Sequence, residues 1–243
     1  MEFNEFYEYC AQVFEKNLDI ELDKEKAEKL FALTEHMLEV NKSLNLTAIK
    51  DEKAIILKHY ADSLTISKYI EPSSKIIDVG CGAGFPTLPL AIFRPDISIT
   101  AIDSTSKRID YVSLTAKMLG LDNITALAVR AEDLSRDSNY RECFDYATAR
   151  AVAALPILTE LCLPFVKLDG KFIAMKAQKG SDEVAAAANA ITKCGGRLSD
   201  VIEISMTSPT NESEARTLVI VSKSAHTPKE FPRHYSKISK KPL

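Results

Sequence analysis

The sequence lacks the features of several large classes of protein. It contains no tryptophan, and none of its apolar runs approaches the roughly 20 residues that a membrane-spanning helix needs. The first residues, Met1-Glu2-Phe3-Asn4-Glu5, are acidic and do not show the basic-then-apolar order of a secretory signal peptide. We therefore expect a soluble, cytoplasmic protein with no membrane partner.

Cysteine and histidine do not form the groupings that bind metal. The five cysteines are an odd number and include no C-x-x-C pair, and the four histidines are far apart in the chain. This spacing argues against a disulfide framework and against a zinc site. We expect no bound metal, and nothing in the sequence demands more than a monomer.

Charge is distributed unevenly along the chain. The formal net charge is −3, which by itself argues against a partner as acidic as nucleic acid. Residues 1–40, however, carry eleven acidic residues and only four lysines, whereas residues 223–243 carry six basic residues and the single acid Glu230. One end of the chain therefore repels phosphate, and the other is expected to contact it.

Glycine and proline are absent from the first 71 residues, since the first proline is Pro72 and the first glycine is Gly80. Apolar residues recur there at helical spacing, and Asp23 and Asp51 stand where N-caps are expected. We predict three helices, at about 3–17, 23–42 and 51–69, that form a helical cap over residues 1–71. A cofactor-binding domain over 72–223 and a basic tail over 224–243 are expected to follow.

From Ser74 onward, short apolar runs alternate with amphipathic stretches. Such alternation predicts an α/β fold with a mostly parallel sheet covered by helices on both faces. The last two runs have no convincing helix between them, so we expect them to form an antiparallel edge. The seven predicted strands are Lys75–Val79, Ser98–Ile102, Ile124–Val129, Phe144–Ala149, Lys171–Met175, Asp200–Met206 and Thr217–Ser222, and the predicted helices between them cover 84–93, 105–119, 153–163 and 181–194.

Three glycines, Gly80, Gly82 and Gly84, follow the first predicted strand directly. Glycines at this point allow the backbone to approach a ligand closely. Asp103 ends the second predicted strand, where a carboxylate can bind both hydroxyls of a ribose. The two features together predict a cofactor that contains a nucleoside.

The spacing of the turn favours one such cofactor. A nicotinamide-binding turn would read G-x-G-x-x-G, whereas this turn reads G-x-G-x-G, and Asp78 precedes its first glycine by two residues. A carboxylate there suits a ligand with a positive amino group, as S-adenosylmethionine has. The spacing resembles the first motif of the class I methyltransferases, which hold the adenine amino group with an acid after the third strand. Here Ala131-Glu132 occupies that place.

The fourth strand limits the chemistry of the acceptor. The chain has neither the N/D-P-P-Y/F motif of adenine amine methylation nor the Pro-Cys pair of pyrimidine C5 methylation, and we interpret Cys81 and Cys162 as structural. A site without an evident base or nucleophile suits guanine N7, whose lone pair can attack the methyl group directly when it is well oriented. Arg150 leaves this strand and is expected to reach guanine, a phosphate or the cofactor. Lys176 and Lys179 are candidates for phosphate contact, with ordinary solvent exposure as the alternative.

Several motifs in order resemble the bacterial small-subunit ribosomal RNA methyltransferase G family. They cover about residues 20–243: Asn45-Leu46-Thr47-Ala48-Ile49, His59-Tyr60-Ala61-Asp62-Ser63-Leu64, the glycine turn with Phe85-Pro86, Asp103-Ser104, Arg130-Ala131-Glu132, Ala149-Arg150-Ala151, Met175-Lys176, Phe231-Pro232-Arg233 and Lys240-Lys241-Pro242-Leu243. Three residues depart from the family pattern, namely Cys81, Thr87 and Ala177. We expect Thr87 to alter helix packing more than binding.

The resemblance implies a specific activity. It implies methyl transfer from S-adenosylmethionine to N7 of one guanine in 16S ribosomal RNA, free or within the small subunit or its precursor, on the class I fold with a helical N-terminal extension. It places cofactor contacts on Gly80, Phe85, Ala131, Glu132 and Arg150, with Asp103 as the ribose acid. We expect Arg233, Lys237, Lys240 and Lys241 of the tail to contact RNA.

Two other functions remain open from the residues. A small-molecule methyltransferase could use the same fold, with the helical cap closing over its substrate. A nucleotide-binding scaffold without chemistry could retain the glycine turn. Salt dependence separates the first from an RNA enzyme, because phosphate contacts make RNA binding weaken steeply as salt rises.

Overall fold

A seven-stranded sheet organises the protein, for which the computed structural model describes residues 1–177 and 182–243. The strand order is β3-β2-β1-β4-β5-β7-β6. The first five strands pair in parallel, and β7 is antiparallel to both β5 and β6, which confirms the predicted fold class and its antiparallel edge. The strands are β1 (Lys75–Val79), β2 (Ser98–Asp103), β3 (Ile124–Ala128), β4 (Phe144–Arg150), β5 (Val166–Ala177), β6 (Gly196–Thr207) and β7 (Ser213–Lys223).

The amino-terminal helices match the prediction in place, but the third is not a regular α-helix throughout. They comprise α1 (Phe3–Leu18), α2 (Lys24–Leu44), α3 (Glu52–Ile55), the π-helical segment η1 (Ile56–Ala61), α4 (Asp62–Leu64) and the short 3₁₀ turn η2 (Ser67–Tyr69). Asp23 and Asp51 cap α2 and α3 by accepting hydrogen bonds from the backbone N–H of Lys26 and Ala54. Within the single helix predicted over 51–69, the backbone thus widens into a π-helical segment at η1 and continues into α4.

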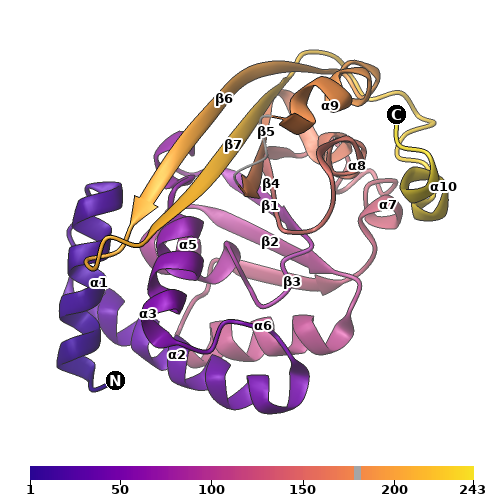
Figure 1. Ribbon diagram of the computed structural model, residues 1–243. Coiled ribbons are helices and arrows are strands. Elements are labelled where there is room, and N and C mark those ends of the chain that lie inside the picture. The colour runs from indigo at the N-terminus through magenta and orange to yellow at the C-terminus, as the bar shows by residue number, and fades with distance from the viewer. Residues whose placement is uncertain (178–181) are drawn as a thin grey trace.

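Helices cover both faces of the sheet (Figure 1). These are α5 (Thr87–Phe93), α6 (Ser106–Met118), α7 (Ala131–Leu134), α8 (Leu155–Cys162), η3 (Leu163–Phe165), α9 (Asp182–Lys193) and α10 (Tyr235–Lys240). Consecutive strand residues face opposite sides, so Ile76 packs into one core with the cap, α5 and α6, and Ile77 packs into the other with α8, α9 and Ile238 of α10. The helical cap therefore shares a core with the sheet.

The long β6–β7 hairpin reaches from the sheet to the amino-terminal helices (Figure 1). The side chain of Asn17 in α1 donates a hydrogen bond to the Thr207 carbonyl at 3.0 Å and accepts one from the Thr207 N–H at 2.7 Å. Strands β5, β6 and β7 extend beyond the predicted runs because their added residues are mostly polar or exposed and carry no apolar signal. Within the described ranges, no helix is long and apolar enough to cross a membrane.

Candidate active site

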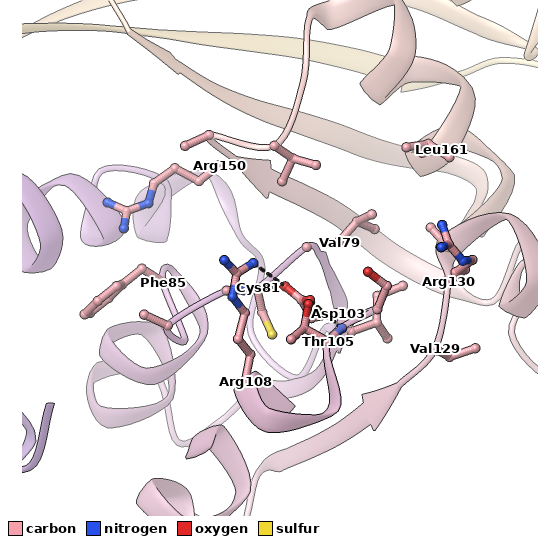
Figure 2. Close-up of a pocket in the computed structure, with 18 of the residues that line it drawn as sticks. Val79, Cys81, Phe85, Asp103, Thr105, Arg108, Val129, Arg130, Arg150 and Leu161 are labelled. Atoms are coloured by element: carbon pink, nitrogen blue, oxygen red, sulfur yellow. Dashed lines mark hydrogen bonds and ion pairs between the residues drawn. The ribbon is translucent and has the colours of Figure 1, made fainter. Parts of the chain in front are cut away.

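A cavity of about 500 Å³ opens at the carboxyl ends of the parallel strands. It lies where the strand order reverses between β1 and β4, which is the usual position of a ligand in an open α/β sheet. Phe85 and Arg150 lie at one end, Asp103 near the middle, and Arg130 with Leu161 at the other end (Figure 2). The arrangement of these side chains from one end of the cavity to the other suits an elongated ligand.

The glycine turn forms the floor of the cavity, but its three glycines have different roles. Gly80 has φ +77°, and a Cβ atom there would lie 2.6 Å from Val152. Gly80 and Gly82 line the cavity, whereas Gly84 does not. Gly84 has φ +83° and lies against Leu88, which a Cβ atom would approach to 2.5 Å. The structure thus corrects the prediction that Gly84 contacts the cofactor, because this glycine instead lets α5 pack close to the turn.

Asp103 is fixed at the middle of the cavity. Its carboxylate accepts hydrogen bonds from the Gly82 N–H at 3.1 Å and the Thr105 N–H at 2.8 Å, and it is only 7% exposed. Arg108 Nη1 lies 3.5 Å from Asp103 Oδ2 (Figure 2). An acceptor held in this way by backbone donors fits the two hydroxyls of a ribose.

Glu132 places a buried carboxyl oxygen without a hydrogen-bond donor at the cavity wall. The residue is 4% exposed, and its Oε1 has no hydrogen-bond partner among the described residues. The nearest cationic atom is Arg130 Nη1, 3.9 Å away. Because a buried carboxylate oxygen without a donor is costly, the site fits a ligand that brings a donor such as the adenine amino group.

Asp78 lies beneath the turn rather than in the cavity, contrary to its predicted contact with the cofactor. It is 1% exposed, does not line the cavity, and accepts a hydrogen bond from Thr87 Oγ1 at 2.6 Å. Burial raises the pKa of Asp78 to about 6. Thr87, which we expected to affect packing more than binding, therefore holds this acid. The Asp78 Oδ1 atom has no partner among the described residues.

Arg150 joins the sheet to the helical cap at the other end of the cavity. Its Nη1 lies 2.8 Å from Asp62 Oδ2 and donates to the Lys58 carbonyl at 3.1 Å. The guanidinium carbon lies 5.2 Å from the centroid of the Phe85 ring, and His59 stacks on the same ring at 4.5 Å with an interplanar angle of 9°. The guanidinium is therefore paired with Asp62 and held in one orientation.

His59 and Asp62 were not predicted as site residues from their chemistry. They lie three residues apart on the η1–α4 stretch, and both contact Arg150. Burial and the Arg150 charge lower the pKa of His59 to about 3, so its ring is neutral at pH 7. The only available signal was their place in the family resemblance, because the Arg150 contact joins residues far apart in the chain.

A second cavity of about 400 Å³ adjoins the first, since His59, Arg150 and Ala151 line both. Lys176 also lines it, but its Nζ lies 2.9 Å from Glu183 Oε2 and donates to the Ala153 carbonyl at 2.9 Å. Lys176 is thus held in an internal ion pair, and its phosphate contact stays a prediction. The companion candidate, Lys179, lies outside the described residues.

The four basic residues predicted to contact RNA from the tail divide into two groups. Arg233 forms a bidentate ion pair with the fully buried Glu160, with contacts of 2.8 and 2.6 Å, so its predicted RNA contact is replaced by a structural one. Lys237, Lys240 and Lys241 are exposed. No group of three or more potential metal ligands occurs in the part of the chain that the structure describes.

Comparison with known structures shows the fold. The structure aligns with a SAM-dependent methyltransferase from Methanosarcina mazei with a TM-score of 0.51, at 16% identity, over 66% of this chain and 97% of the other. It aligns with precorrin-6y C5,15-methyltransferase from Geobacter metallireducens with a TM-score of 0.52, at 14% identity, over 74% and 92% of the chains. The likeness supports the class I methyltransferase architecture.

Comparison of sequences shows the family. The model of the family "rRNA small subunit methyltransferase G" matches residues 26–211. Two curated relatives named ribosomal RNA small subunit methyltransferase G are 40% and 38% identical: that of Clostridium botulinum (98% of this chain and 99% of the relative) and that of Lactobacillus johnsonii (96% and 99%). The cavity's acceptors fit S-adenosylmethionine, the cofactor of this enzyme family. The chain therefore belongs to the rRNA small subunit methyltransferase G family.

Proposed function

We propose that this enzyme transfers a methyl group from S-adenosylmethionine to N7 of one guanine in 16S ribosomal RNA. The observation that carries the proposal is the meeting of two cavities at Arg150 and His59, one with acceptors for a nucleoside and one open beside it. The names of the relatives support ribosomal RNA as the substrate. The absence of an evident base or nucleophile among the described residues of the site supports guanine N7 as the acceptor atom.

The residues along the first cavity would fix the orientation of the cofactor, with its adenine at one end and its sulfonium at the other. Asp103 would accept hydrogen bonds from the ribose, and Glu132 beside Ala131 would accept one from the adenine. Gly80 and Gly82 would bring the backbone close to it. Asp78 and Gly84 would not contact the cofactor but would stabilise the glycine turn. The opposite end, at Phe85 and Arg150, would then lie near the sulfonium, which supplies the electrophilic methyl group.

The second cavity would receive the acceptor base beside that end. The lone pair of guanine N7 is unprotonated at neutral pH, so its methylation needs orientation rather than a base. His59, with a pKa of about 3, is a weak base and a flat neutral surface. Arg150, fixed by Asp62, would donate toward guanine O6 and thereby act as the orienting catalytic residue.

The exposed lysines of the tail would contact phosphate. Lys237, Lys240 and Lys241 stand on the surface near α10 in an otherwise acidic protein, which confines RNA contact to part of the surface. We propose that the enzyme acts as a metal-free monomer on the small ribosomal subunit or its precursor in the cytoplasm.

Mapping the methyl group tests the proposal. The protein is incubated with methyl-labelled S-adenosylmethionine and with unmodified small-subunit RNA, either free or in particles. We expect label in RNA and, after borohydride and aniline treatment, cleavage at a single guanine. Arg150→Lys keeps the charge but loses the planar guanidinium, and it should lower kcat more than it raises the Kd for RNA. Bound cofactor with no label in RNA would contradict the proposal, and salt-independent turnover of a small acceptor would favour the small-molecule alternative.

A further inference from the structure

We infer that Tyr235 supplies an aromatic wall to the adenine end of the cofactor cavity. Tyr235 lines the same cavity as Glu132 and Leu161, although it lies far from them in the chain. It is 37% exposed, so its ring is only partly covered by protein. The inference rests on the cofactor direction proposed above, with the base beside Glu132.

The carboxyl-terminal segment is built to carry Tyr235 to this place. Figure 1 shows α10 beside α7 and α8, the elements that hold Glu132 and Leu161. Ile238 of α10 is fully buried in the core on that face of the sheet, and the Arg233 ion pair with Glu160 holds the chain two residues before Tyr235. The position of the ring is therefore set by the fold.

Two arginines hold the stretch of chain that precedes α10. The Arg141 guanidinium donates to the carbonyls of Thr227 and Phe231 at 2.8 and 3.0 Å, and Arg136 donates to the Pro232 carbonyl at 2.6 Å. Arginine is suited to holding several carbonyls at once because its donors form a rigid fork. These bonds attach the segment to the loop that follows α7, and thus to the wall that contains Glu132.

The groups at this end point to a flat heteroaromatic ligand with an amino group. Glu132 presents a buried carboxylate oxygen that has no donor among the described residues, while Leu161 and Val129 present apolar surface (Figure 2). An aromatic side chain beside such a surface can stack on a base without selecting its hydrogen-bonding edge. Glu132 would then read the amino group, and Tyr235 would cover the ring.

Cofactor affinity measured by calorimetry tests the inference without any methyl transfer. The ligands are S-adenosylhomocysteine and 5′-methylthioadenosine, which share adenine and ribose but not the amino-acid part. Tyr235→Ala should raise the Kd for both by about tenfold, since stacking on a base has that size of effect. Tyr235→Phe keeps the ring and should stay within about twofold of the wild type. Ser239→Ala, an exposed position on the same helix, is the matched control and should leave both Kd values unchanged.

Several outcomes would overturn the inference. One is a Kd for Tyr235→Ala within about twofold of the wild type, and another is an equal loss in Tyr235→Phe. A loss for S-adenosylhomocysteine that is absent for 5′-methylthioadenosine would place the ring elsewhere. Tyr235→Leu, which keeps bulk without a π face, should also lose affinity and replaces the alanine variant if that fails to fold. Wild-type binding with no RNA label would instead count against the proposed function alone.

Discussion

Four acidic residues in and around the site differ in the donors that each receives. Asp103 accepts hydrogen bonds from two backbone N–H groups, and Asp62 forms ion pairs with two arginines, Arg150 and Arg216. Asp78 accepts a hydrogen bond from the Thr87 hydroxyl, and one oxygen of Glu132 has no donor among the described residues. Hydrogen bonds and opposite charges stabilise an ionised carboxylate, whereas burial opposes ionisation. The four acids therefore differ in how much capacity each has left to accept a hydrogen bond from a ligand. Asp62 orients a cation, whereas Glu132 is left for a ligand.

Asp78 should make stability depend on pH in an unusual direction. Its pKa rises from 3.8 to about 6 on folding because of burial, so its favourable contribution is present below pH 4 and is lost as pH rises through 6. Asp78→Asn, which mimics the neutral acid, should therefore be more stable than the wild type by about 3 kcal/mol at pH 7. The difference should disappear near pH 4, as urea unfolding between pH 4 and 8 can measure.

Asp145 offers a control of opposite sign. Its pKa is lowered, with hydrogen bonds and ion pairing to Lys167 outweighing desolvation, so its contribution is present at neutral pH and is lost as pH falls. Asp145→Asn should therefore reduce stability at pH 7 and less so in acid. If Asp78→Asn and the wild type changed in parallel with pH, the buried carboxyl would not titrate as described.

At the scale of elements, the turn between β1 and α5 serves both binding and packing. Its first two glycines line the cavity, and Gly84 lies against Leu88 at the start of α5 and Val112 of α6. The π-helical segment η1 in the third cap helix has a similar double role. It brings His59 and Asp62 to Arg150 while Ile56 and Tyr60 remain in the core.

Gly84→Ala should be costly because both conformation and space oppose it. The residue has φ +83°, and its new Cβ atom would lie 2.5 Å from Leu88 Cδ1. We expect the free energy of unfolding to fall by about 3 kcal/mol. Gly120→Ala is the matched control, with φ +65° and no described atom within 4 Å of the added Cβ, and it should cost about 1 kcal/mol. Equal losses in urea unfolding would show that contact with Leu88 is unimportant.

At the scale of the whole molecule, basic residues of the last 21 positions have separate tasks. Arg233 is bound to Glu160 inside the protein, and Lys223 is buried beside Glu142. Lys237, Lys240 and Lys241 are exposed on the surface. The basic end predicted from composition is therefore partly a structural attachment and partly a free cationic surface, which reduces the charge available to RNA.

Replacing the two groups separately should separate their roles. Changing Lys237, Lys240 and Lys241 together to Gln should weaken RNA binding and lower the slope of log K against log salt by about 0.7 for each lost phosphate contact. The Kd for S-adenosylhomocysteine should not change. Arg233→Gln should instead lower the free energy of unfolding by about 3 kcal/mol, because it leaves Glu160 buried without its partner. An unchanged salt slope in the lysine variant would show that the tail does not contact phosphate.

Much of the fold was predictable because its signals are local. Strand β1 matches its predicted bounds, and the parallel sheet with an antiparallel edge follows from runs of apolar residues and the helices between them. Gly80, Gly82 and Asp103 were also found at the cavity, since they lie at the carboxyl ends of neighbouring parallel strands. The π-helical segment η1 was missed because helical spacing alone does not reveal where a helix widens.

The order of strands and helices along the chain, the position of the glycine turn and the family follow from the amino-acid sequence. Which charged side chains find a partner is set instead by tertiary packing. Arg150 pairs with Asp62, Lys176 with Glu183 and Arg233 with Glu160, whereas Tyr235 reaches the cavity of Glu132. Spacing along the chain specifies local conformation, but the partner of a side chain depends on which distant segments the packed core brings together.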